Sequence, residues 1–178
     1  MLAYFTSAAL RPNKKVRFDF FYMHSMNSSI FLPSILNAPW LSDANKARLL
    51  EWKARSDLAL YVSRGTPPLL IDEVRNYRPK KPSGWDDIFA RAIVFEDDGH
   101  ASKLVRAAAN GEKVCGKFLD AAAGPPKAFR ILSDDWLQFG HMIIDAAEDG
   151  KVQAPVWVRN AGMDEAWVEV GDREQANL

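Results

Sequence analysis

Cysteine is almost absent from this sequence, since Cys115 is the only one among 178 residues. No intramolecular disulfide can form, and neither a CxxC redox motif nor a cysteine-based zinc cluster exists. The only cations close to Cys115 in the sequence are Lys113 and Lys117, and no histidine adjoins it. We therefore predict a buried structural thiol rather than a nucleophile. The lack of disulfides also fits an intracellular, cytoplasmic location.

The sequence also lacks net charge and long hydrophobic runs. Lysine plus arginine and aspartate plus glutamate number 23 each, so no overall field attracts nucleic acid or an anionic membrane. No apolar run approaches the roughly 20 residues that span a bilayer. Residues 1–10 are apolar, but Arg11, the first cation, follows them instead of preceding them, which is atypical of a signal peptide. We expect no nucleic acid, no membrane span, and a small-molecule or protein partner.

Several catalytic and nucleotide-binding motifs are missing. The sequence contains no GxGxxG after a strand, no P-loop, no GxSxG elbow and no HExxH. Rossmann-type dinucleotide binding, P-loop phosphoryl transfer, serine hydrolysis on an α/β-hydrolase fold and zincin chemistry therefore have no support.

What the sequence does contain is helical periodicity with marked helix starts. Residues 42–63 repeat apolar side chains at three- and four-residue spacing after a serine N-cap, which predicts an amphipathic helix. Ser83 is predicted to begin a second helix through a capping box. Ser133 is predicted to cap a third helix, over residues 134–148, which is apolar around most of its circumference and is therefore expected to be central to the core. Alternation of period two is weak, so we predict an all-α fold.

Residues 18–36 are apolar on every side except for a few serines and an asparagine, and Pro33 should bend or end any helix there. This pattern predicts a buried helix with polar side chains at its middle. Hydrophobic residues make up 48% of the chain, which is typical of a globular protein. We predict one irregular helical domain over residues 1–178. Its apolar helix faces are expected to need a cover and to promote self-association where exposed.

His100 is the histidine with the most ionisable neighbours. An uninterrupted helix would place Glu96, His100 and Lys103 on one face, a spacing that helical bundles use for metal ligands. A helix break at Gly99 is an equal alternative, because glycine is unfavourable in a helix interior. Lys103 is interpreted either as the partner of Glu96 or Asp97 in an ion pair, or as a carbamate-forming metal ligand.

The other two histidines are interpreted differently. His24 lies among Asn27 and serines on the helix predicted over residues 18–36, and so many polar groups in an apolar helix favour a site. His141 lies on the most apolar helix, where a core histidine bonded to Asp145 is the preferred interpretation.

The sequence resembles the C-terminal region of the questin oxidase-like family. No single segment is specific, but the order and spacing of several together are, with Asp-Asp-Gly-His the most distinctive. The segments are residues 21–25 (FYMHS), 28–32 (SSIFL), 49–53 (LLEWK), 57–61 (DLALY), 84–89 (GWDDIF), 97–107 (DDGHASKLVRA) and 157–167 (WVRNAGMDEAW).

The resemblance implies a helical oxidoreductase of fungal secondary metabolism. Such enzymes use molecular oxygen and NADPH for Baeyer–Villiger-type oxidation, a monooxygenase reaction, or for ring cleavage of anthraquinones and related aromatic polyketides. Family members are longer and carry a histidine-rich segment ahead of this region, so the chain is expected to be the C-terminal part of a larger helical fold. His24, His100 and Lys103 would then be its contribution to a metal site, with iron as the candidate metal. The alternative is a non-catalytic helical fragment or interaction module.

Overall fold

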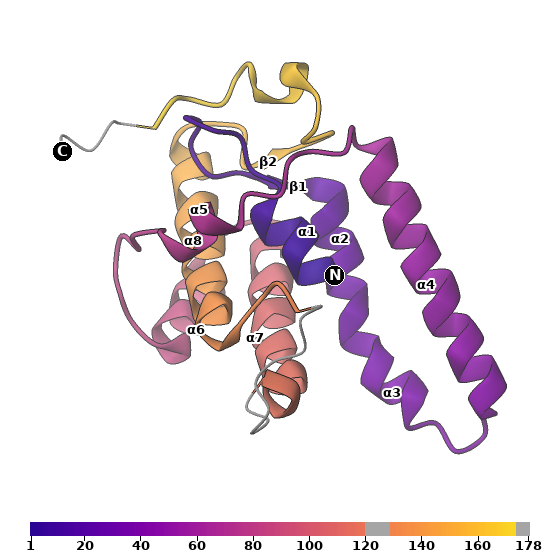
Figure 1. Cartoon of the computed structure of the whole chain (residues 1–178). Coiled ribbons are helices and arrows are strands. Elements are labelled where there is room, and N and C mark those ends of the chain that lie inside the picture. The colour runs from indigo at the N-terminus through magenta and orange to yellow at the C-terminus, as the bar shows by residue number, and fades with distance from the viewer. Residues whose placement is uncertain (120–128, 174–178) are drawn as a thin grey trace.

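The computed structural model describes residues 1–119 and 129–173, and these are mostly helical (Figure 1). The predicted all-α fold is confirmed, because the strands within these described residues are a single parallel pair of two residues each. The elements follow in the order α1 (Leu2–Ala8), β1 (Phe18–Asp19), α2 (Phe20–Ser28), the 3-10 helix η1 (Ser29–Phe31), α3 (Leu32–Leu36), α4 (Asp43–Ser63), α5 (Ile71–Arg75), α6 (Trp85–Val94), α7 (His100–Leu119), α8 (Ser133–Val152), β2 (Trp157–Val158) and the 3-10 helix η2 (Asp164–Trp167).

Helices α7 and α8 lie side by side and form the centre of the core (Figure 1). Leu104 and Ala108 on α7, and Phe139 and Ile143 on α8, are fully buried. Helices α1, α2, α5 and α6 pack around this pair. The prediction that the third helix is central to the core is confirmed.

The helix starts are predicted correctly in one case and wrongly in two. The Ser42 side chain accepts a hydrogen bond from the Asn45 N–H, as expected of an N-cap. Helix α8 instead includes Ser133 as its first residue, and the Asp135 carboxylate accepts the Leu132 N–H at 2.9 Å. Helix α6 begins only after Gly84, with no side-chain cap. The prediction that Ser83 and Ser133 are N-caps is therefore wrong. Gly84 lies at the N-cap position of α6, and Leu132 lies at that of α8.

The long buried helix predicted over residues 18–36 is wrong. The segment divides into β1, α2, η1 and α3, and Pro33 lies at the start of the last of these, as proline favours. Only one side of α2 is buried, through Tyr22, Met23 and Met26, while Phe31 and Leu36 are exposed.

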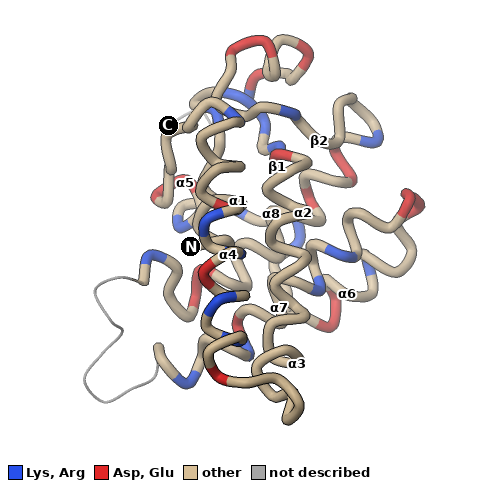
Figure 2. Tube along the Cα trace, turned by 90° about the vertical axis from the view of Figure 1, so that its right-hand side faces the viewer, with Lys and Arg blue, Asp and Glu red and all other residues tan. Residues whose placement is uncertain are grey.

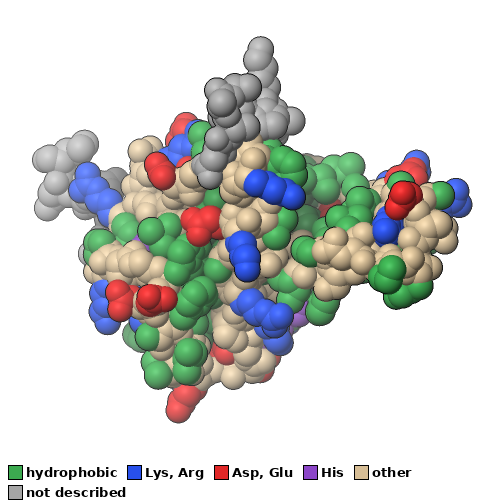
Figure 3. All heavy atoms as spheres, turned by 90° about the horizontal axis from the view of Figure 1, so that it is seen from below, with side chains coloured by type: hydrophobic (Ala, Val, Ile, Leu, Met, Phe, Trp, Pro, Cys, Tyr) green, Lys and Arg blue, Asp and Glu red, His purple; other side chains and the backbone are tan. Residues whose placement is uncertain are grey.

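Helix α4 stands at the side of the body in Figure 1 and contacts mainly α2. Asp57 is its only buried residue. Trp40, just before the helix, is 82% exposed, and Val62 near its end is 65% exposed. Figure 3, which views the molecule from below, shows hydrophobic side chains both on the main body and on the part that projects to the right. Exposed apolar side chains are thus present on α4 and also elsewhere, for example at Ile93 on α6 and Val152 on α8, while self-association stays a prediction.

None of the described helices is long and apolar enough to cross a bilayer. Figure 2 shows basic and acidic residues interspersed along the chain.

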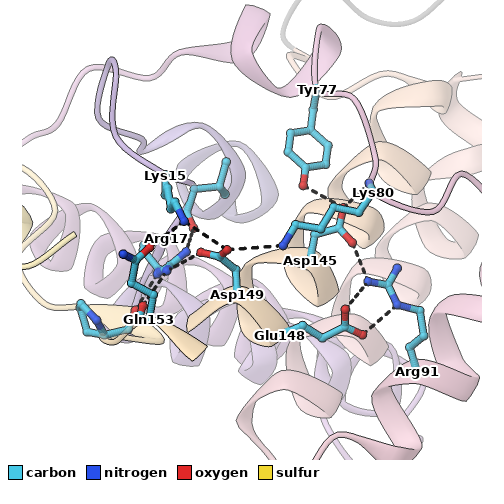
Figure 4. Close-up of polar contacts among 11 residues, drawn as sticks. Lys15, Arg17, Tyr77, Lys80, Arg91, Asp145, Glu148, Asp149 and Gln153 are labelled. Atoms are coloured by element: carbon cyan, nitrogen blue, oxygen red, sulfur yellow. Dashed lines mark hydrogen bonds and ion pairs between the residues drawn. The ribbon is translucent and has the colours of Figure 1, made fainter. Parts of the chain in front are cut away.

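A polar cluster joins four parts of the chain around the end of α8 (Figure 4). Arg17 donates to the Asp149 carboxylate at 2.8 Å and to the carbonyl oxygens of Pro155 and Gln153 at 2.6 and 3.0 Å. One turn earlier on α8, Asp145 accepts hydrogen bonds from Tyr77 and the Lys80 backbone, and an ion pair from Arg91. These contacts connect the 11–17 loop, the 76–83 loop and α6 to one helix.

The end of α4 is anchored by a close approach of two glycines. The Gly162 N–H donates to the Arg64 carbonyl at 2.9 Å, and a Cβ on Gly162 would lie 2.2 Å from the Gly65 oxygen. Gly65 itself has a φ of +87°, which favours glycine. We expect Gly162→Ala to lower the free energy of unfolding by about 1–3 kcal/mol, since the backbone at Gly65 or at Gly162 must move to make room for the new methyl group. Urea denaturation measures this.

Gly84→Ala is the matched control. A Cβ at Gly84 has no atom within 4 Å among the described residues, so its cost should stay below about 1 kcal/mol. Equal stability losses in the two variants would contradict the close approach as the cause.

Candidate functional site

Two histidines from different helices meet at one point. The ring centroids of His24 on α2 and His100 on α7 lie 5.0 Å apart, with the ring planes perpendicular. The Phe20 ring lies 4.6 Å from His24 and 5.1 Å from His100, measured between centroids. The predicted approach of His24 to His100 is therefore present in the structure, although the two residues lie 76 positions apart in the chain (100 − 24).

The start of α7 fixes the position of His100. Gly99 adopts a φ of +86°, which ends any continuation of the helix toward the N-terminus, and α7 begins at His100. The Asp97 carboxylate accepts the N–H groups of Gly99 and Ala101 at 2.7 and 2.8 Å, as in an N-cap. The alternative of a helix break at Gly99 is thus the correct one.

The helical face predicted to continue through Glu96 is consequently wrong. Glu96 lies outside α7 and forms an ion pair with Lys151 at 3.2 Å. Lys103 is exposed, and within residues 1–119 and 129–173 it forms no ion pair with Glu96 or Asp97. Lys103 does not face inward, because the buried face of α7 passes through Ala101, Leu104 and Ala108 and leaves Lys103 at the surface. Its role as a metal ligand stays a prediction.

His100 is held by the carboxylate of Asp98. Its Nδ1 contacts an Asp98 oxygen, and the histidine side chain is only 13% exposed. The hydrogen bond from His100 lowers the pKa of the Asp98 carboxyl below its usual value. A carboxylate on one ring nitrogen orients the imidazole and leaves the other nitrogen for a ligand or a proton.

His24 is more exposed than His100, and its pKa depends on the charges of residues near His100. Partial burial lowers the pKa of His24, and the positive charges of His100 and Lys103 lower it further, while Asp98 opposes them. The lowered pKa favours the neutral form of the imidazole. Lys103 thus acts on the histidine pair through its charge.

A cavity of about 380 Å³ opens beside this pair. It is lined by Phe20, Asp98, His100, Val156, Trp157 and Arg159. The Arg159 guanidinium lies 4.8 Å from the Phe20 ring centroid, a cation–π contact. The cavity therefore combines an imidazole, a carboxylate and a guanidinium with aromatic walls.

Pairing of the two short strands brings Trp157 and Arg159 to the histidines. Phe18 is in register with Trp157 in the parallel ladder. The buried Asp19 accepts the Phe21 N–H at 2.8 Å and the Ala161 N–H at 2.9 Å, and burial raises the pKa of its carboxyl despite these bonds. Arg159 was not predicted from the sequence as a site residue. Its only signal was its place in the segment 157–167.

The donor set fits a metal only in part. Two imidazoles lie together, but the described residues contain no group of three histidine, cysteine or acidic side chains that could hold a metal ion. Three protein ligands are usual in catalytic sites of this kind. The described residues alone therefore do not complete a metal site.

The remaining candidates lie elsewhere in the core. His141 is buried as predicted, but its Nε2 lies 2.9 Å from the Ser83 carbonyl, and the predicted Asp145 partner is wrong. Arg91 and Tyr77 occupy Asp145 instead. Partial burial raises the pKa of the Cys115 thiol, consistent with an unreactive cysteine.

These features define a helical protein with a histidine-containing polar cavity and none of the common nucleotide-binding motifs. Residues 1–108 match the family model described as questin oxidase-like. The chain belongs to the questin oxidase-like family.

Curated relatives extend the similarity over nearly the whole chain. A Baeyer-Villiger oxidase of Pestalotiopsis microspora is 42% identical over 96% of this chain, and an oxidoreductase of Aspergillus parasiticus is 40% identical over 88%. A questin oxidase of Aspergillus terreus is 35% identical over 94% of the chain. The chain spans 37%, 30% and 37% of the lengths of these relatives, respectively.

Proposed function

We propose that the protein serves as an oxidoreductase in the metabolism of a fungal aromatic polyketide. The reaction is an oxygen-dependent Baeyer–Villiger-type oxidation of an anthraquinone-like substrate, with NADPH as the reductant. The observation that carries the proposal is the 42% identity with a Baeyer-Villiger oxidase over 96% of the chain. The histidine cavity supports it, since it offers polar groups beside aromatic walls.

The proposed reaction balances as a monooxygenation. One atom of dioxygen is inserted between the carbonyl carbon of the substrate and its neighbouring carbon, which breaks the bond between those carbons and gives an ester. The other atom leaves as water, with two electrons and a proton from NADPH and one proton from solvent.

The residues of the cavity have distinct parts in this proposal. Attack of a peroxide oxygen on a carbonyl places negative charge on the carbonyl oxygen, and the Arg159 guanidinium is the cation available in the cavity to stabilise it. An imidazole can take or return a proton, and the Asp98 contact orients His100 for that exchange. Phe20 and Trp157 supply flat surfaces for an aromatic substrate.

Oxygen consumption tests the proposal directly. With NADPH and a hydroxylated anthraquinone, we expect uptake of one dioxygen per quinone and a product heavier by one oxygen atom, followed by an oxygen electrode and mass spectrometry. Arg159→Met should lower the rate about 100-fold, as loss of an oxyanion partner does elsewhere. Arg55→Met, on the exposed surface of α4, should leave the rate unchanged. Absence of oxygen uptake would favour a non-catalytic interaction module.

A further inference from the structure

A second cavity lies between α1, α3, α4, α7 and the start of α8, and shares no lining residue with the histidine cavity. Its volume is about 610 Å³, within the range of sites for small organic ligands. Most of its lining is apolar, including Phe5, Leu36 and Val114. Apolar walls alone do not identify a ligand, but two buried polar groups among them do.

The first of these groups is the carboxylate of Asp57, whose side chain is 4% exposed. Ser25 and Lys53 both donate to its Oδ1. Its Oδ2 is buried and has no hydrogen-bond partner among the described residues. A buried acceptor without a donor is costly, so a ligand that donates a hydrogen bond there is favoured.

The second group is the indole N–H of Trp136, which is also buried and without an acceptor in the described part of the chain. Its ring lies against α7, because a Cβ on Gly111 would come within 2.3 Å of the indole. Gly111 therefore allows the ring to lie flat on the helix at the cavity wall. A ligand with an acceptor atom would satisfy this donor.

We propose that this cavity binds a flat aromatic molecule that carries both a hydroxyl and a carbonyl group. The hydroxyl donates to Asp57 Oδ2, the carbonyl oxygen accepts from Trp136 Nε1, and the apolar walls cover the rings. The choice of a hydroxyquinone within this class rests on the proposed function. The site itself rests on the cavity and on its two unsatisfied groups.

Asp57→Asn separates the two oxygens of the carboxylate. Ser25 and Lys53 are donors and require the amide oxygen at the Oδ1 position, so the amide NH₂ group takes the place of Oδ2. A donor there cannot accept the ligand hydroxyl. Binding of 1,8-dihydroxyanthraquinone to the wild-type chain, measured by equilibrium dialysis, should include one molecule per chain at this cavity, in addition to any held at the histidine cavity. Asp57→Asn should weaken it about tenfold to 100-fold.

Unsubstituted anthraquinone is the control ligand, because it has no hydroxyl and should bind the wild type and Asp57→Asn equally. Asp43→Asn is the control variant on the same helix, since its side chain is fully exposed, and it should change neither affinity. Trp136→Phe should weaken binding of both quinones about threefold to tenfold, because both carry a carbonyl. A thermal transition recorded for each variant establishes that it is folded.

The outcomes distinguish this site from the proposed reaction, because dialysis is done without NADPH. Selective weakening of the hydroxyquinone by Asp57→Asn supports the site whether or not oxygen is consumed. No binding, or equal loss of both quinones in a folded Asp57→Asn variant, overturns it.

Discussion

Replacing Arg17 with methionine is expected to lower the free energy of unfolding by about 3–5 kcal/mol. Arg17 is 1% exposed, and one guanidinium satisfies the carboxylate of Asp149 and the carbonyl oxygens of Pro155 and Gln153. Methionine fills similar volume but donates no hydrogen bond, so the two carbonyl oxygens and the Oδ2 atom of Asp149 lose this donor. For a chain of this size the midpoint of thermal unfolding should fall by roughly 6–20 °C. Urea denaturation and calorimetry measure both quantities.

The pH dependence provides a second readout of the same contact. Burial raises the pKa of the Asp149 carboxyl, but the hydrogen bond from Arg17 and the charges of Arg17, Lys80 and Lys15 outweigh burial and lower it overall. A lowered folded pKa means that this stabilisation is present above the ordinary aspartate range, near pH 4, and is lost as the pH falls through the folded value. Arg17→Met should flatten this acid loss.

Arg55→Met is the matched control, because its guanidinium is 75% exposed and pairs only with Glu51 on the same helix. Its stability cost should be below about 0.5 kcal/mol. If Arg17→Met cost no more than this control, the cluster around α8 would not be a source of stability.

Arg17 also shows where prediction from the sequence ends. Helical periodicity and the Ser42 cap were sufficient for α4, because both signals lie within one segment. The Arg17 contacts join residues 132 and 138 positions apart, and nothing local to Arg17 predicts them. The predicted serine cap of α8 was wrong, because the carboxylate that accepts a hydrogen bond at the start of this helix belongs to Asp135. Local patterns thus predict helices, while burial of charge depends on tertiary packing.

The residues of the candidate site were likewise predicted only in part. His24 and His100 were both named from the sequence, and the structure brings them together. Lys103 was grouped with Glu96 and His100 by extending one helix through Gly99, and the positive φ of that glycine separates Glu96 from α7. Arg159 was missed because it follows a two-residue strand whose partner, Phe18–Asp19, is distant in the sequence. Which residues share a helical face is thus predictable only within the true bounds of the helix.

The second large effect is expected at the histidine pair. If iron binds there, His100→Ala should abolish binding, with at least a 100-fold loss of affinity, and His24→Ala should do the same. The two rings are 5.0 Å apart, so one ion can contact both with small side-chain rotations, and removal of either leaves a single imidazole. The Asp98 contact orients His100 and favours its ring as a ligand, so Asp98→Asn should weaken binding about tenfold.

Anaerobic dialysis against ferrous iron, followed by metal analysis, measures this without any turnover. His141→Ala is the control, because His141 is buried against Ser83 and belongs to neither cavity, so it should lose packing stability and keep its iron. Lys103→Ala decides the role of the lysine: weaker binding supports a third ligand, whereas unchanged or tighter binding shows that its charge only opposes the ion. Less than stoichiometric iron in the wild type would refute metal binding by the pair. Equal iron in the wild type and in folded His24→Ala and His100→Ala variants would refute it too, because the described residues contain no group of three ligands that could hold the ion instead.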